Sequence, residues 1–488
     1  MSTHSCRGCE RCDGSLISRH ELRFHPTIER DGIADVRRRA NDAGVRFADV
    51  RGWMSPQGGT AGIAVGTCTR RQTMPAHAIK PIGLFLGLLF LGIGIAPGVR
   101  ASTLQTTSGD IAVSNLESSL RAAWSDYLRL ARKKDAPGRI VQLEQLKAQF
   151  LGDIESPDRL DHLAAELRRH EPEAGETYLL SARIAAYLHR FEEAEADLRQ
   201  AGRRGVLAAM TEPVRLSIQQ ATGKRLAEVL AVRRRRAQTI SGVDELLPLA
   251  ALLVDLGEYE EADRVYARAL AQYRDVSPFP PAWVCFQRGV LWGERMPAPQ
   301  PERARRYYEM ALAYLPTYVP ARVHLAELYA RRGALAKAEA LLTPGARRGD
   351  PESRWRLAQV LKEQGRAQEA QEQLLGARAS YDRLLARHEL AFADHAAEFY
   401  LGDGNDVLKA LSLARRNLAN RPTLRAFELA HEAAVRVGER RLAASLLAEA
   451  WARLGNTKAF QLSPLSRART GHPTAAPSEG MTRPRRTP

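Results

Sequence analysis

Small and apolar residues recur with helical spacing through the central part of the chain. In the segment PERARRYYEMALAYLP, Ala304, Tyr308 and Ala311 are spaced by four and then three residues. This spacing places the three side chains along one side of a helix. Pro316 follows five residues later, where it stops the helix. The pattern therefore predicts a helix that packs on one face and ends before Pro316.

The segment that follows carries the same pattern on two more helices. Its small and large positions are Leu325, Ala326, Tyr329, Ala338 and Leu342. Gly333 stands between the two helices, where a left-handed residue ends the first one at least cost. Ala304 and Ala338 are 34 residues apart, which is the length of the tetratricopeptide helix-turn-helix unit. The segment resembles the tetratricopeptide repeat family.

Matching positions recur over residues 175–454 at nearly the same period, with a degenerate unit around Gly223. The position at which the family favours tryptophan is mostly filled by other residues. The resemblance implies an all-α fold, a right-handed superhelical solenoid of antiparallel helix pairs. Residues 102–174 are predicted to form N-terminal capping helices, with a capping-box pattern from Ser114 to Glu117. A generic alanine-rich helical bundle is the alternative.

The two ends of the chain have a different character. Residues 74–101 combine a short basic start, an apolar run from Ile82 to Ala96, and small residues at Val99 and Ala101. This layout predicts a secretory signal peptide and an exported, periplasmic protein. It also suggests that translation begins at Met74, so that residues 1–73, a low-order basic segment, are not translated. A signal anchor that holds the repeats in the periplasm at the inner membrane, and a buried core helix, are the alternatives. Residues 455–488 are predicted to form a disordered basic tail.

Cysteines give little further information. Cys6, Cys9 and Cys12 have the CxxCxxC spacing of thiolate metal ligands, but no fourth ligand stands at a convincing distance. Cys68 also precedes the apolar run, which leaves Cys285 alone in the repeat region. If the first segment is absent from the mature protein, no intramolecular disulfide can form, and packing must stabilise the fold.

The net charge of +16 and the pI near 9.9 widen the choice of partners to nucleic acid, anionic lipid and acidic protein. The positive charge is spread along the chain, and the only dense run is Arg233 to Arg236 on a predicted helix. We expect this run to be a solvated helix face rather than an anion-binding patch.

The sequence holds no recognisable catalytic motif. Ile218 stands where a phosphate loop ending at Lys224 needs a glycine, and neither HExxH nor GxSxG occurs. His395 and Glu398 share a predicted helix face, and His388 lies seven residues before His395. A metal-dependent enzyme centred there is an alternative, but scattered charges on an ordinary repeat explain the same residues. The prediction is a protein that is not an enzyme and has no cofactor, metal site or small-molecule substrate.

The resemblance also implies where a partner binds, since in this family the first helix of each pair lines the concave surface. Carried over residue by residue, the groove positions are Arg183, Tyr187, Arg288, Trp292, Glu327, Arg331, Trp355, Gln359 and Lys362. Aromatic and arginine side chains of this kind suit the capture of a peptide. The leading hypothesis is a non-catalytic interaction scaffold in the cell envelope that binds a protein or peptide, with no nucleic acid. A cytoplasmic regulator or nucleic-acid binder that uses the basic surface is the alternative.

Overall fold

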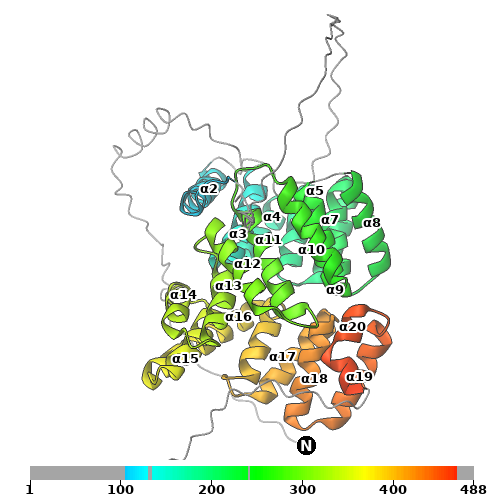
Figure 1. Cartoon of the computed structure of the whole chain (residues 1–488). Coiled ribbons are helices and arrows are strands. Elements are labelled where there is room, and N and C mark those ends of the chain that lie inside the picture. Colours follow the sequence, from blue (N-terminus) through cyan, green and yellow to red (C-terminus); the bar gives the residue numbers. More distant parts are fainter. Residues whose placement is uncertain (1–104, 130–134, 240–241, 470–488) are drawn as a thin grey trace, which may run out of the picture. The chain divides into compact units, whose positions relative to one another are not determined.

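The computed structural model describes residues 105–129, 135–239 and 242–469 (Figure 1). These residues form helices and turns, with no β-strand among them. The predicted signal peptide at 74–101 and the segment 1–73 lie outside the described residues, as does the tail from residue 470. Within the described part, no helix has both the length and the apolar character that a membrane span requires.

Three helices precede the repeats, and they are α2 (Gly109–Arg129), α3 (Ala136–Leu151) and α4 (Ser156–His170). The predicted start of the first helix at Ser114 is wrong, because α2 begins at Gly109. Gly109 lies against the turn that precedes α13, and a Cβ atom there would stand 2.6 Å from Pro316 Cδ. Tertiary contact with a distant turn therefore decides where this helix can begin.

Antiparallel helix pairs make up the rest of the chain, and each element packs on the next. The first five pairs are α5 (Gly175–Tyr187) with α6 (Phe191–Arg203), α7 (Ala208–Ala221) with α8 (Leu226–Thr239), α9 (Val243–Leu256) with α10 (Tyr259–Gln272), α11 (Phe279–Val290) with α12 (Pro301–Tyr314), and α13 (Val319–Ala330) with α14 (Leu335–Arg347). A π-helical turn, η1 (Leu291–Arg295), extends α11. The later helices are α15 (Pro351–Glu363), α16 (Ala367–Leu401), α17 (Val407–Asn420), α18 (Leu424–Val437) and α19 (Arg440–Leu454). This arrangement confirms the predicted all-α solenoid of antiparallel helix pairs.

The long helix α16 belongs to two successive pairs. His388 has non-helical backbone angles, φ −136° and ψ 48°, so the chain bends there. The part before His388 pairs with α15, and the part after it serves as the first helix for α17. The bend at His388 thus takes the place of the turn between two helices, and no glycine is needed there.

Small residues allow the helices of a pair to approach closely, as the sequence pattern predicts. Ala304 and Ala311 are completely buried, and Tyr308 between them fills the space toward α11. A Cβ atom on Gly289 of α11 would stand 2.3 Å from Cε1 of the Tyr308 ring. Only glycine fits under this ring, so the tyrosine and the glycine act as one packing unit.

The array continues beyond the predicted repeats. Residues 458–469 form α20 (Lys458–Leu462) and α21 (Pro464–Arg469), so the prediction of disorder from residue 455 is wrong for this stretch. Phe460 is completely buried beside Trp451, with the ring centroids 5.7 Å apart. The buried Phe460 side chain stabilises this helical stretch, which the polar composition of the region does not predict.

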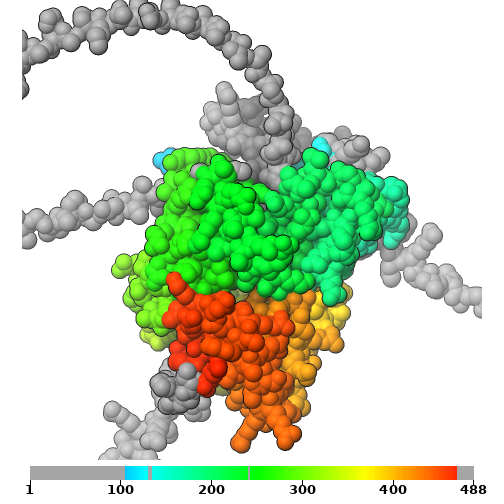
Figure 2. All heavy atoms as spheres, turned by 90° about the vertical axis from the view of Figure 1, so that its right-hand side faces the viewer, coloured from blue at the N-terminus to red at the C-terminus, as the bar shows by residue number. Residues whose placement is uncertain are grey.

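Helices from the two ends of the described region contact one another. Asp158 of α4 lies 2.7 Å from Nε2 of His388, and Arg387 also pairs with it. The amide of Asn420 donates a hydrogen bond of 2.9 Å to the carbonyl oxygen of His189, and α20 packs on α9. In Figure 2 the C-terminal repeats lie directly against the green surface of the earlier repeats. The repeats therefore close on themselves, which gives the array contacts between units that are not neighbours in sequence.

Candidate partner-binding face

Ion pairs connect the first helix of each pair to the first helix of the next. We call these residues the first-helix charge ladder: Glu294 with His324 at 2.8 Å, Glu327 with Arg356 at 2.7 Å, Glu352 with His395 at 3.9 Å, and Glu398 with Arg425 at 2.5 Å. The ladder runs from η1 through α13, α15 and the second part of α16 to α18. It forms because first helices lie side by side in a stack of helix pairs.

In the first pair of the ladder, each partner shifts the pKa of the other. Burial alone would lower the pKa of His324, but the adjacent Glu294 carboxylate outweighs it and raises the pKa to about 9. Burial opposes the charge on Glu294, yet the same histidine holds the pKa of that carboxyl down at about 2. The pair is therefore ionised on both sides at neutral pH.

Four of the predicted groove residues are exposed, partly exposed or part of the ladder. Glu327 pairs with Arg356 as described, while Arg331, the C-cap residue of α13, and Lys362 on α15 are exposed. Arg183 on α5 is half-buried, and burial lowers the pKa of its guanidinium. These positions remain available to a partner, and their use in binding stays a prediction.

The other predicted groove residues are already engaged within the array. Arg288 and Trp292 both bind the carboxylate of Asp263, at 2.7 Å and 3.0 Å. The indole of Trp355 and the amide of Gln359 both donate to the carboxylate of Asp403, at 2.7 Å and 2.6 Å. Tyr187 is partly buried and packs on the core. Both tryptophans are less than a tenth exposed, so their main contribution is to hold neighbouring helices together.

Sequence reasoning missed five of the eight ladder residues, which are Glu294, His324, Glu352, Arg356 and Arg425. One signal was available, since opposite charges stand about one repeat apart, as do Glu398 and Arg425 with a separation of 27 residues. That signal is weak in a chain with many charges, because the stacking of the helices decides which pairs meet.

Comparison with known families supports this architecture. Residues 298–348 match the model of the tetratricopeptide repeat family. Residues 298–348 therefore form a tetratricopeptide repeat. Proteins of this family generally act as non-catalytic scaffolds that bind other proteins. A search of curated proteins finds no match.

Several solved structures resemble the repeat array at low sequence identity. A tetratricopeptide repeat protein from Parabacteroides merdae is 17% identical, covers 53% of this chain and 98% of its own, and has a TM-score of 0.31. Yeast Tom70 is 13% identical over 74% of this chain and 94% of its own, with a TM-score of 0.29. A Cytophaga hutchinsonii tetratricopeptide protein fragment is 12% identical over 59% of this chain and 98% of its own, with a TM-score of 0.25. At these scores the likenesses carry no inference about partners.

The histidines considered for a metal site do not come together in the repeat array. His388 contacts Asp158 across the closure, while His395 lies near Glu352 in the ladder. The bend at His388 is the reason, because it takes this side chain off the stripe that contains His395 and Glu398. Across residues 105–129, 135–239 and 242–469, no group of three or more His, Cys, Asp and Glu side chains is placed to hold a metal ion.

The arginine run on α8 is not the solvated face that its sequence suggests. Arg233 is only 6% exposed, and burial lowers the pKa of its guanidinium to about 10. Arg234 pairs with Glu261 at 2.9 Å, and Arg236 pairs with Glu245 at 2.6 Å. Two of the four arginines therefore pair with acidic side chains and a third is buried, so the run offers little positive charge to a nucleic acid.

Proposed function

We propose that this tetratricopeptide repeat protein is a scaffold in the cell envelope that binds an extended or helical segment of a partner protein along its first-helix face. The first-helix charge ladder is the observation that supports this proposal. It presents acidic and basic groups in a row across consecutive repeats, from Glu294 to Arg425. A partner segment with alternating charges can replace these internal pairs one by one, so that binding leaves no charge unpaired.

Exposed cations flank the ladder and can guide the approach of a partner. Arg331, at the C-terminal end of α13, and Lys362 on α15 are exposed and form no ion pair within the described part of the chain. Long-range attraction of this kind raises association rates more than affinity, and salt screens it. We therefore expect acidic groups at the ends of the bound segment.

Incorporation of a photo-crosslinking amino acid in the native host tests the binding face. The amino acid is placed at Arg331 or Lys362, and in a matched control at Arg264, which is exposed on the second helix α10. We expect the same partner to be crosslinked at both first-helix positions and not at the control. Equal crosslinking at all three positions, or none at the two first-helix positions, would contradict the proposal.

The envelope location rests on the sequence of residues 74–101, which has the layout of a cleaved export signal. N-terminal sequencing and fractionation of the protein from its own host test this part separately. Export predicts a mature chain that begins at Ser102 in the periplasmic fraction. A chain that begins at Met1 and stays in the cytoplasm would remove the envelope from the proposal but leave the binding face open to test.

A further inference from the structure

A second surface carries positive charge that the protein itself does not neutralise. A cleft of about 830 Å³ lies between the turn that joins α3 to α4, the end of α14, and helices α15 and α16. Its charged lining residues are Glu117, Lys147, Asp153, Glu155, Arg347, Arg348, Arg354 and Arg383. The cleft is separate from the first-helix charge ladder and shares no residue with it. Its volume is in the range of small-molecule sites.

Two of the three acidic residues that line this cleft already form ion pairs. Asp153 lies 2.6 Å from Lys147 and 3.1 Å from Arg159, and these cations hold the pKa of its carboxyl below the usual value although burial opposes this. Glu155 is 72% exposed and lies 3.7 Å from Arg159. Glu117 is thus the only acidic lining residue without an ion pair in the described structure.

The arginines of the cleft have no such matches. Arg347, Arg348 and Arg383 are exposed, and none of them forms an ion pair with a described residue. Arg348 instead lies close enough to Arg322 for its charge to add to the effect of burial and lower the pKa of that guanidinium. Like charges gathered from different helices without an anion repel one another, and a bound anion relieves this repulsion.

Arg354 is held in place at the floor of the cleft. Its Nε atom donates a hydrogen bond of 3.0 Å to the carbonyl oxygen of Ala346. Its guanidinium crosses α16 at Gly376, where a Cβ atom would stand 2.0 Å from Nη1. A glycine in the middle of a helix is destabilising relative to alanine. Here it provides the space in which the guanidinium lies.

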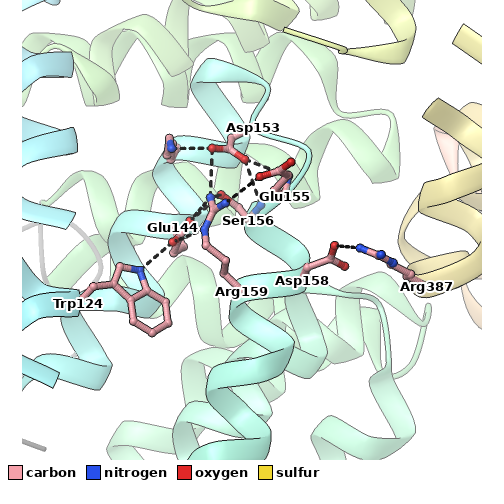
Figure 3. Close-up of polar contacts among 9 residues, drawn as sticks. Trp124, Glu144, Asp153, Glu155, Ser156, Asp158, Arg159 and Arg387 are labelled. Atoms are coloured by element: carbon pink, nitrogen blue, oxygen red, sulfur yellow. Dashed lines mark hydrogen bonds and ion pairs between the residues drawn. The ribbon is translucent and has the colours of Figure 1, made fainter. Parts of the chain in front are cut away.

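The opposite wall of the cleft is held in place by a buried polar network. Figure 3 shows Arg159 between Glu144 and Asp153, with Trp124 and Ser156 bound to the same glutamate. Arg159 binds Glu144 through two nitrogens, at 2.7 Å and 2.8 Å. The turn between α3 and α4 is therefore fixed before any ligand binds, which reduces the entropy cost of binding.

We propose that this cleft binds an anion that carries two or more negative charges on phosphate groups. Guanidinium groups match phosphate oxygens through paired hydrogen bonds, and arginines from three elements converge on one space. Apolar lining is limited to Leu151, Ile154 and Ala379, so the uncharged part of the ligand is small. Either a soluble oligophosphate or a phosphorylated lipid headgroup has this chemistry.

Calorimetric titration of the full chain with sodium tripolyphosphate at low salt tests the cleft. We expect saturable binding that the double substitution Arg348→Gln with Arg383→Gln weakens at least tenfold. The matched control is Arg440→Gln with Arg441→Gln, which removes the same charge from exposed positions on α19. No saturable binding, or an equal loss in both double variants, would overturn the proposal.

A glycine substitution tests the geometry rather than the charge. Gly376→Ala displaces the Arg354 guanidinium, a flexible side-chain end, and we expect it to weaken tripolyphosphate binding severalfold. Gly138→Ala on α3 is the control, since a Cβ atom there meets nothing within 4 Å. If both variants bind as the unchanged protein does, Arg354 has no part in the site.

Vesicles distinguish the two sources of phosphate. Co-sedimentation with phosphatidylcholine vesicles that contain phosphatidic acid is measured with and without tripolyphosphate. Vesicle binding that needs Arg348 and Arg383 and that tripolyphosphate competes away supports a lipid headgroup. Tripolyphosphate binding without vesicle binding supports a soluble ligand.

Discussion

At the scale of single residues, the most informative side chains are those whose charge depends on a neighbour from another repeat. His324 is the clearest case, since Glu294 raises its pKa from 6.5 to about 9. A histidine whose pKa is raised by folding stabilises the protein fully below pH 6.5, and this contribution is lost as the pH rises through about 9. The pair is partly exposed, so we expect a contribution of about 1 kcal/mol.

The substitution His324→Gln tests this contribution. Between pH 6.5 and pH 9 the free energy of unfolding of the unchanged protein should fall by about 1 kcal/mol more than that of the variant. Urea denaturation followed by circular dichroism at both pH values measures the difference. His162→Gln, at an exposed position on α4, is the control and should behave as the unchanged protein does. If the stability of the unchanged protein and of the variant depends on pH in the same way, folding does not raise the pKa of His324.

At the scale of elements, one buried carboxylate joins the three helices that precede the repeats. Glu144 on α3 is completely buried and accepts hydrogen bonds from Trp124 on α2 and from Ser156 and Arg159 on α4. Figure 3 shows these side chains converging from the three helices. Loss of this carboxylate charge weakens the hydrogen bonds of all three partners and leaves Arg159 paired with Asp153 at 3.1 Å, which we expect to cost about 2 kcal/mol.

Glu144→Gln should therefore lower the free energy of unfolding by about 2 kcal/mol, while the shape of the side chain is kept. Glu166→Gln on α4 is the control, because its partners Arg169 and His170 lie on the same helix and such pairs contribute little. We expect the control to change stability by less than about 0.5 kcal/mol. Denaturant titration measures both, and equal effects would mean that Glu144 does not hold the three helices together.

At the scale of the whole described region, the closure between early and late repeats is the feature that a simple stack of neighbours lacks. Asp158 pairs with Arg387 and contacts His388, and both residues lie at the bend in α16. Repeat arrays without such contacts unfold as a chain of nearest-neighbour units. Contacts between distant units make unfolding more cooperative. When the repeats at one end unfold, the repeats at the other end lose the contacts that they made with them.

Asp158→Asn should weaken this closure by about 2 kcal/mol, since it removes the charge that pairs with Arg387 and weakens the contact with Nε2 of His388. Amide hydrogen exchange should speed up at the bend near His388 and at the turn near His189, which the same late repeats contact. Asp161→Asn is the control, because its partner Arg190 lies on the neighbouring pair. Exchange that speeds up only around α4 in the Asp158 variant would contradict a role in closure.

The repetition of small and large residues was sufficient to predict the class of fold. Ala304, Tyr308 and Ala338 follow a period that only a stack of helix pairs satisfies, and each of them is buried as the period requires. Such prediction works because each repeat packs on its sequence neighbours, so local pattern and tertiary contact coincide. The same reasoning placed Glu327 and Lys362 on first helices, where they lie, whereas Arg331 directly follows the last residue of α13.

Tertiary structure alone decided the features that depend on residues far apart in sequence. No local pattern shows that Gly109 meets Pro316, that Phe460 is buried, or that Asp158 meets His388. The packing of the helices likewise decided which charged groups stay exposed, so Arg233 is buried while Arg348 lines an open cleft. The physical reason is that composition sets how much charge a chain carries, whereas only the folded arrangement sets which charges meet.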